Sequence, residues 1–162
     1  VQASLTGHLV LSSIHANDAA GTFFRLIHLG IDKYLVNSSV LALISQRLIR
    51  LSCPHCSKPV KANKEINKIY EEVMEESLQG YKKGEGCSYC LQTGYLGRTG
   101  VFELLMVNNQ IRQMFSSGAN STEIKAAAVE AGMITMLKDG FIKVKQGLTT
   151  PTEVLRTVYS ID

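Results

Sequence analysis

The sequence has no tryptophan, only three prolines and no long hydrophobic run. Polar residues interrupt its apolar stretches well before the roughly 20 consecutive apolar residues that a membrane-spanning helix needs, so we expect no transmembrane segment. The small number of prolines, together with 45% hydrophobic residues, excludes a disordered or collagen-like chain. The 162 residues suffice for one compact domain with a small appendage.

The sequence also lacks a large excess of positive or negative charge. The net charge is +3 and is spread along the chain, so there is no electrostatic reason to expect a direct nucleic-acid partner. The first residues lack the pattern of a signal peptide, which favours a cytoplasmic location. Because Val1 stands in place of a methionine and the sequence begins in a pattern typical of ordered structure, we expect a part of a longer protein.

Local patterns in the first third of the chain predict an α/β fold. The apolar run 8–14 is flanked by turn-forming residues and is typical of a buried strand. The pair Asn17-Asp18 would supply the cap of a following helix, and Gly30 suits the left-handed position just beyond its end. Asp32 would start a second helix, because apolar residues recur at helical spacing from there to Cys53.

The rest of the chain predicts one more strand and several helices. Residues 61–86 hold five lysines and six glutamates, which indicates a solvated, partly helical insert. A strand is expected from Val101 to Leu104. The remaining segments predict helices over 111–115, after a cap at Asn120 or Ser121, over 136–146, and from Thr150-Pro151 onward, where proline suits the first helical position.

All four cysteines fall in two Cys-x-x-Cys pairs that are 30 residues apart, Cys53 with Cys56 and Cys87 with Cys90. Each pair forms a tight turn that presents two thiolates, and two such turns complete a tetrahedral shell around Zn²⁺. Four thiolates leave no coordination position open for water, so the zinc should be structural rather than catalytic.

Three other interpretations of the cysteines remain at this stage. Two disulfides are disfavoured by the expected cytoplasmic location. A rubredoxin-like iron site uses similar spacing, but that small fold has no charged helix between its two turns. His55 could replace one cysteine as a ligand, yet it lies inside the first turn and four cysteines already suffice, so we expect it to be exposed.

His8 and His15 flank the predicted strand. If the strand is extended, the two imidazoles lie about 23 Å apart and cannot share one ligand, since a strand rises about 3.3 Å per residue. In open parallel α/β sheets, ligands gather at the carboxyl ends of strands, where His15 with Ser12 and Ser13 could contact a phosphate. His8 would face a different surface. On this pattern alone, structural roles for both histidines are the favoured interpretation.

Several blocks of the sequence occur together. They are Thr6-Gly7-His8-Leu9-Val10-Leu11-Ser12-Ser13-Ile14-His15-Ala16-Asn17-Asp18, then Gln46-Arg47-Leu48, the two cysteine pairs, Gly94-Tyr95-Leu96-Gly97-Arg98 with Glu103, and Gly147-Leu148-Thr149-Thr150 before Glu153-Val154-Leu155-Arg156. In this order they resemble the C-terminal portion of the secretion and pilus-assembly ATPases, the motors of type II secretion and type IV pili. The first block corresponds to that family's histidine box, and the resemblance covers nearly all of the chain.

The resemblance implies a part of a RecA-like, hexameric ATPase that works at the inner face of the bacterial cell membrane with a membrane-platform partner. The implied catalytic residues are His15, which would sense the terminal phosphate, and His8, which would position it or contact a neighbouring subunit. Ser12 and Ser13 would bind the nucleotide. A tetracysteine insert is typical of extension and secretion motors, whereas retraction motors generally lack it.

The resemblance also implies three regions. Residues 1–52 would complete a partial RecA-like core, residues 53–90 would form the zinc insert, and residues 91–162 would end the core and add a helical subdomain. A Walker A loop ends in Gly-Lys-Ser/Thr, but none of the eleven lysines is followed by serine or threonine. The Walker B acidic residues are also missing. The chain alone should therefore not hydrolyse ATP, and ATP with Mg²⁺ would bind only to the longer parent.

A zinc-ribbon module that binds another protein is the alternative function. Residues 61–86 sum to a charge of −1 and show no alternation of aromatic and basic residues, which disfavours nucleic acid as its partner. This alternative leaves the histidine box and the C-terminal helices unexplained.

Overall fold

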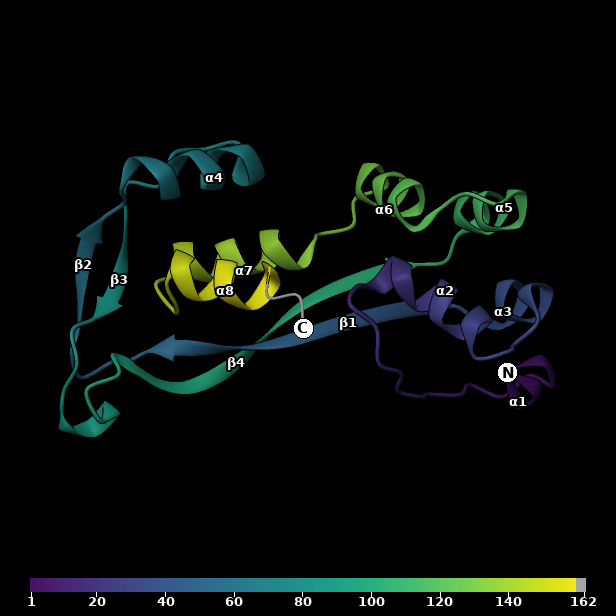
Figure 1. Cartoon of the computed structure of the whole chain (residues 1–162), viewed down its shortest axis with the longest axis horizontal. Helices are drawn as coiled ribbons and strands as arrows, with labels where there is room; N and C mark the ends of the chain where they lie inside the picture. Colours follow the sequence, from purple (N-terminus) through teal and green to yellow (C-terminus); the bar gives the residue numbers. More distant parts are fainter. Residues whose placement is uncertain (160–162) are drawn as a thin grey trace. The chain divides into compact units, whose positions relative to one another are not determined.

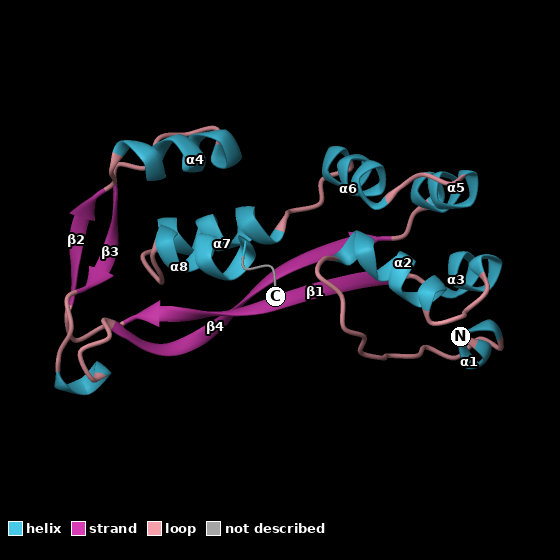
Figure 2. Cartoon of the chain, in the orientation of Figure 1, coloured by secondary structure: helices cyan, strands magenta, loops and turns pink. Residues whose placement is uncertain are grey.

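The computed structural model describes residues 1–159 as a mixed α/β chain with two two-stranded sheets (Figures 1 and 2). The chain divides into two compact units, and each is built from two separate segments. Unit 1 comprises Val1–Ser45 and Glu103–Thr135, and unit 2 comprises Gln46–Phe102 and the residues from Met136 onward. Within residues 1–159, every helix is too short or too polar to cross a lipid bilayer.

Unit 1 is mostly helical. Its core packs Phe23 against Phe115, whose ring centroids are 4.5 Å apart, and is completed by residues such as Val36, Leu105 and Ile124. Its elements are α1 (Gln2–Leu5), α2 (Ala19–His28), α3 (Lys33–Ser39), α5 (Asn109–Ser117), α6 (Ser121–Glu130) and the adjoining ends of strands β1 (Ala42–Ser52) and β4 (Tyr95–Met106).

Local capping signals in unit 1 were predicted correctly. The Asp18 carboxylate accepts the N–H of Gly21 at 2.7 Å and caps α2, and Gly30 lies beyond the end of that helix with φ +85°. Asp32 caps α3 through the N–H of Tyr34. Of the two candidates for the cap of α6, Asn120 accepts the N–H of Glu123. These positions follow from contacts within four residues, which is why sequence alone reveals them.

The strand predicted over residues 8–14 is wrong, because this segment has neither helix nor strand structure. A strand needs a neighbouring chain to take its N–H and C=O groups, and no described strand is paired with this segment. Leu9 and Leu11 are consequently 80% and 90% exposed. The inferred place of His15 at the carboxyl end of a strand therefore has no support in the structure.

The helix predicted from Asp32 to Cys53 is also wrong beyond Ser39, because residues 42–52 form β1. Its side chains alternate, with Leu43 buried and Ile44 68% exposed. Antiparallel pairing with β4 is fixed at both ends, where Val107 N–H donates to Leu41 C=O at 3.0 Å and Cys53 N–H donates to Gly94 C=O at 2.9 Å. The apolar residues in this stretch fit the helical period of about 3.6 residues and also the strand period of 2. Pairing with the distant strand β4 selects the strand.

Unit 2 contains the insert and the C-terminal helices. Its elements are β2 (Ser57–Lys61), α4 (Lys64–Met74), β3 (Gly80–Gly84), the 3-10 helix η1 (Ser88–Cys90), α7 (Met136–Lys145), α8 (Pro151–Tyr159) and the remaining parts of β1 and β4. Strands β2 and β3 are antiparallel, with Ser57 opposite Gly84 and Lys58 opposite Lys83.

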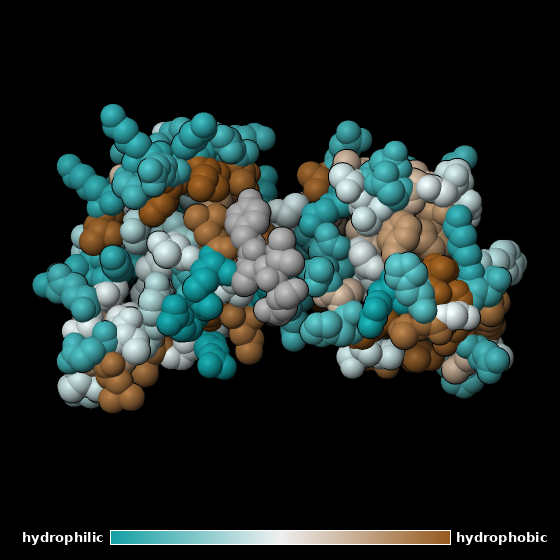
Figure 3. All heavy atoms as spheres, viewed as in Figure 1, coloured by the Kyte–Doolittle hydropathy of each residue, from teal (hydrophilic) through white to brown (hydrophobic). Residues whose placement is uncertain are grey.

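Three local expectations for unit 2 were confirmed: the helix in the insert, the strand from Val101 and the helix that begins at Pro151. Residues of α4 such as Tyr70 pack against Phe141 of α7, with ring centroids 5.2 Å apart. In Figure 3, hydrophilic side chains lie along the outer edge of α4, as expected for a solvated insert, whereas hydrophobic ones lie on its side toward α7. The strand expected from Val101 to Leu104 exists as part of the longer β4, and α8 begins at Pro151 as predicted.

A buried carboxylate anchors α8. Glu153 is fully buried, and its Oε2 accepts a hydrogen bond from the Arg50 guanidinium at 2.6 Å while its Oε1 accepts the Arg50 backbone N–H at 3.0 Å. Arg156 binds the same carboxylate at 2.9 Å. Burial raises the pKa of Glu153, but the hydrogen bonds from Arg50 and Arg156 outweigh it and lower the pKa to about 2. The carboxylate therefore stays charged at neutral pH and joins α8 to β1.

Glu153→Gln should lower the free energy of unfolding at pH 7 by about 2–4 kcal/mol, because it removes charge-assisted hydrogen bonds from a buried site. The native pKa of about 2 lies below the ordinary 4.5, so this stabilisation is complete above pH 4.5 and is lost as the pH falls toward 2. The difference between wild type and variant in urea denaturation should shrink over that range.

The matched control is Glu85→Gln, which breaks the ion pair with Lys58 between side chains that are 60% and 66% exposed. Exposed pairs contribute less than about 1 kcal/mol. Equal destabilisation by the two variants, or a difference that does not depend on pH, would contradict the assigned role of Glu153.

Candidate functional site

The four cysteines meet at one point in unit 2. Cys53 follows β1, Cys56 precedes β2, Cys87 precedes η1, and Cys90 is the last residue of η1. All four Sγ atoms lie within 4.8 Å of one another. The Sγ atoms of Cys53 and Cys87 are 3.9 Å apart, as are those of Cys56 and Cys90. A tetrahedron with Zn–S bonds of about 2.3 Å has edges of about 3.8 Å, so the cluster fits a metal ion such as zinc.

Backbone N–H groups point at the sulfur atoms. Cys90 Sγ accepts from the N–H of Cys87 and of Gly94, both at 3.3 Å, and Cys56 Sγ accepts from Gly86 at 3.4 Å. Burial raises the pKa of the Cys90 thiol, but these N–H groups and the neighbouring thiols outweigh it and lower the pKa to about 6. Such donors stabilise thiolates, which are the form of cysteine that binds metal. For Cys56, burial and the neighbouring thiols outweigh the Gly86 N–H and raise the pKa to about 11, so the negative charge is favoured on Cys90 and not on Cys56.

Glycines allow the two cysteine turns to approach each other. A Cβ atom on Gly84 would collide with the carbonyl oxygen of Gly94. Gly94 itself has φ +76°, donates to Cys90 Sγ and accepts the N–H of Cys53. Gly94 was noted above only within a sequence block, and Gly84 was missed, although the run Gly84-Glu85-Gly86 directly before Cys87 was an available signal.

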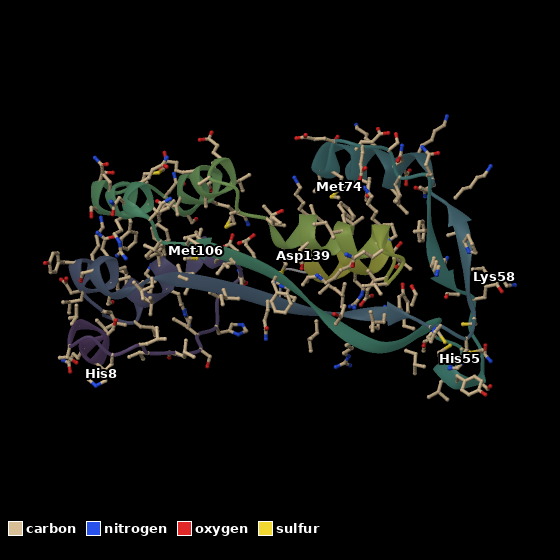
Figure 4. All side chains as sticks on the ribbon, turned by 180° about the vertical axis from the view of Figure 1, so that it is seen from behind. His8, His55, Lys58, Met74, Met106 and Asp139 are labelled. Atoms are coloured by element: carbon tan, nitrogen blue, oxygen red, sulfur yellow. The ribbon has the colours of Figure 1, made fainter. Side chains whose placement is uncertain are left out.

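The structure argues against two of the three alternatives for the cysteines, namely disulfide bonds and His55 as a ligand. All four are free, and the Sγ–Sγ separations of 3.7–3.9 Å are far longer than the disulfide bond of about 2.05 Å. His55 is exposed, as expected, and stacks on Tyr89 with ring centroids 4.1 Å apart instead of joining the cluster (Figure 4). The identity of the metal, zinc or iron, stays a prediction.

The predicted phosphate-binding residues lie far along the chain from this cluster, in unit 1. His15, Ser12 and Ser13 are all exposed in the irregular segment before α2. His8 is exposed as well, and its Nδ1 lies 3.0 Å from Thr6 Oγ1 (Figure 4). The roles of these four residues stay predictions.

Carboxylates already occupy the N-terminus of α2, where a phosphate was expected. The Ala19 N–H donates to Glu103 at 3.1 Å and the Gly21 N–H donates to Asp18 at 2.7 Å. Sequence analysis noted Glu103 only as part of a block and missed its buried position, because nothing local to a strand residue predicts a partner 84 positions away. The N–H groups of Ala19 and Gly21 are therefore already engaged and are not available to a phosphate.

Comparison with known proteins identifies relatives along nearly the whole chain. The sequence profile of the family described as "Type II/IV secretion system protein" matches residues 1–156. The chain is 41% identical to the type II secretion system ATPase E of Vibrio cholerae over 156 residues, which are 96% of this chain and 31% of that protein. It is 41% identical over 160 residues to the type IV pilus assembly ATPase PilB of Thermus thermophilus, of which it covers 18%.

A third relative is the type IV pilus assembly ATPase TfpB of Acinetobacter baylyi, which is 38% identical over 162 residues and of which 27% is covered. The chain thus spans less than a third of the length of these curated relatives.

Elemental analysis should find about one zinc per chain, because four thiolates with tetrahedral spacing form a closed site. All four thiols should resist a thiol reagent until a chelator strips the metal. Visible absorbance of an iron–thiolate site would assign iron instead. A chain without metal and with four freely reactive thiols would contradict the site.

Gly84→Ala should weaken zinc binding by about 10- to 100-fold, the usual effect of disturbing groups that support the ligands. Competition with a chromophoric chelator measures this affinity. Gly97→Ala is the matched control, because its Cβ meets only Leu51 at 3.6 Å, although φ +80° makes it a strained substitution too. Equal affinity of the two variants would show that the contact between Gly84 and Gly94 does not shape the site.

Proposed function

Because the chain belongs to the family of type II/IV secretion system proteins, we propose that it is the C-terminal part of an ATPase that powers type IV pilus assembly or type II protein secretion. The observation that carries this proposal is the family match over residues 1–156, which includes both the histidine box and the four cysteines. Named ATPases of both systems are about equally similar to the chain, so the proposal covers both.

In this proposal the longer parent is a RecA-like homo-hexamer. Residues 1–52 belong to its ATPase core, residues 53–90 form the metal-binding insert, and residues 91–162 end the core and add the helical subdomain. ATP and Mg²⁺ bind mainly through a Walker A loop and Walker B acidic residues, neither of which occurs in the 162 residues. The chain alone is therefore inactive.

His15 is the proposed sensor of the terminal phosphate, assisted by Ser12 and Ser13, and His8 is proposed to position it or to contact a neighbouring subunit. Exposure of all four side chains supports such a role, because a buried side chain could not reach a nucleotide held by other parts of the parent. An imidazole that donates a hydrogen bond to a phosphate oxygen gains strength as negative charge develops there.

The metal is proposed to be structural zinc, held by Cys53, Cys56, Cys87 and Cys90, whose thiolates leave no position for a substrate. The parent acts in the cytoplasm at the inner face of the cell membrane, on a membrane-platform protein and without direct contact to nucleic acid.

A chimera tests the proposal. In it, this chain replaces the matching segment of the Thermus thermophilus pilus assembly ATPase, to which it is 41% identical. The chimera should release phosphate from ATP, whereas the chain alone should release none above background. His15→Ala in the chimera should lower kcat by about 100-fold, the typical effect of losing one donor to a developing charge.

His55→Ala is the control for the loss of an imidazole, because His55 is exposed in unit 2 and contacts Tyr89. Its kcat should stay within about twofold of the chimera. A chimera that assembles and binds ATP without hydrolysing it would contradict the proposed function. Hydrolysis that His15→Ala leaves unchanged would contradict only the role of His15.

A further inference from the structure

A lysine from α6 joins two carboxylates at the start of α2. Lys125 Nζ lies 3.0 Å from Asp18 Oδ2 and 3.4 Å from Glu103 Oε2. The Glu103 side chain is only 1% exposed, whereas those of Lys125 and Asp18 are about one third exposed. Burial lowers the pKa of Lys125, but the two carboxylates outweigh it and hold the pKa above its ordinary value. The ammonium group is therefore charged and shared by both.

The same two carboxylates hold the first turn of α2. Glu103 accepts the N–H of Ala19 through Oε1, and Asp18 accepts the N–H of Gly21 through Oδ1. Each carboxylate thus uses one oxygen for the helix and the other for Lys125. The position of the first turn of α2 is consequently tied to β4 through Glu103 and to α6 through Lys125.

Asp18 is also the point at which the histidine segment joins this packed structure. Residues 9–17 form no hydrogen bond with any other described residue. His15 lies three positions before Asp18 and is exposed. Ala19 and Ala20, which directly follow Asp18, are buried. Ile14 and Ala16 beside His15 are half-buried, but Asp18 is the first residue after His15 with a hydrogen bond and an ion pair to unit 1. A displacement of His15 along the chain would therefore reach the hydrogen-bonded part of unit 1 first at Asp18.

We propose that Lys125 is a positioning residue that couples the histidine segment to α6, by holding Asp18 and Glu103 together at the first turn of α2. This inference rests on the proposed function, in which His15 contacts the terminal phosphate. When His15 moves toward or away from that phosphate, the shift passes through Asp18 to Lys125 and so to helix α6. In return, Lys125 holds the base of the segment in place, which limits the positions that His15 can take.

A purely structural role of Lys125 is the competing explanation, since a buried carboxylate needs a cation wherever it lies. The two explanations predict different effects of Lys125 substitutions when His15 is absent. A stabilising ion pair contributes the same amount with or without His15. A residue that acts through His15 loses its effect when His15 is removed, and a double-mutant cycle measures this difference.

The first measurement is amide hydrogen exchange on the chain itself, which does not depend on any activity. Lys125→Met should speed the exchange of the Ala19 and Gly21 amides by about tenfold relative to the rest of α2, because their acceptors lose a partner. Lys125→Arg, which keeps the charge, should restore protection. Lys143→Met is the matched control, since Lys143 forms a partly buried ion pair with Asp139 at 2.6 Å in unit 2. Unchanged exchange in Lys125→Met would overturn the proposal.

The second measurement is the kinetics of the chimera defined above. Lys125→Met should lower kcat by about tenfold or more while KM stays within about twofold, because misplacing a group by about 1 Å can cost up to 100-fold. Lys125→Arg should restore most of the rate, and Lys143→Met should leave it unchanged. In a chimera that already carries His15→Ala, Lys125→Met should have no further effect.

An equal loss of kcat with and without His15 would overturn the coupling and leave the proposed function intact. If His15→Ala alone has no effect on hydrolysis, the sensor role in the proposed function fails, and that result is visible without any Lys125 variant.

Discussion

The antiparallel pairing of β1 with β4 is the constraint on which both units depend. Each strand contributes one end to each unit, since the divisions fall at residues 45/46 and 102/103. Leu43 and Leu105 belong to the core of unit 1, whereas Ile49 and Val101 belong to the core of unit 2. Within each core, the residue from β1 and the residue from β4 are more than 50 positions apart in the sequence. A change in register along the ladder would therefore turn apolar side chains outward in both cores at once.

The metal-binding cluster lies directly beyond the end of the β1–β4 ladder. The last backbone hydrogen bond between the strands, from Cys53 to Gly94, places the first cysteine beside the loop that carries Cys90. The close approach of Gly84 to Gly94 then brings the end of β3 to the same loop. A bound ion would close a structure whose backbone already aims N–H groups at the sulfur atoms, which agrees with a stabilising role for the metal.

The features that were predicted correctly from the sequence are those whose determining contacts are local. Asp18, Asp32 and Asn120 cap helices through N–H groups two or three residues away, and the Cys-x-x-Cys spacing itself encodes the turn that presents two sulfur atoms. The predictions were wrong for segments whose structure depends on a partner far away in the sequence. Residues 42–52 carry apolar side chains that fit a helix as well as a strand, and only pairing with β4 selects the strand. For residues 8–14, a strand-like composition was not enough without a paired neighbour. The burial of Glu103 and Glu153 could not be foreseen either, because Lys125 and Arg50 lie 22 and 103 positions away from them. Only Arg156, three positions after Glu153, is a local partner.

The register of the β2–β3 ribbon gives it a further property. Lys58 faces Lys83 across the ribbon, and Pro59, which has no N–H, faces Lys82. Lysine and proline on the outer strands of a small sheet discourage strands of other molecules from pairing with it. Repulsion between Lys58 and Lys83 costs some stability within the ribbon. In return, these lysines and Pro59 disfavour edge-to-edge polymerisation of the insert when many copies of the chain are crowded together.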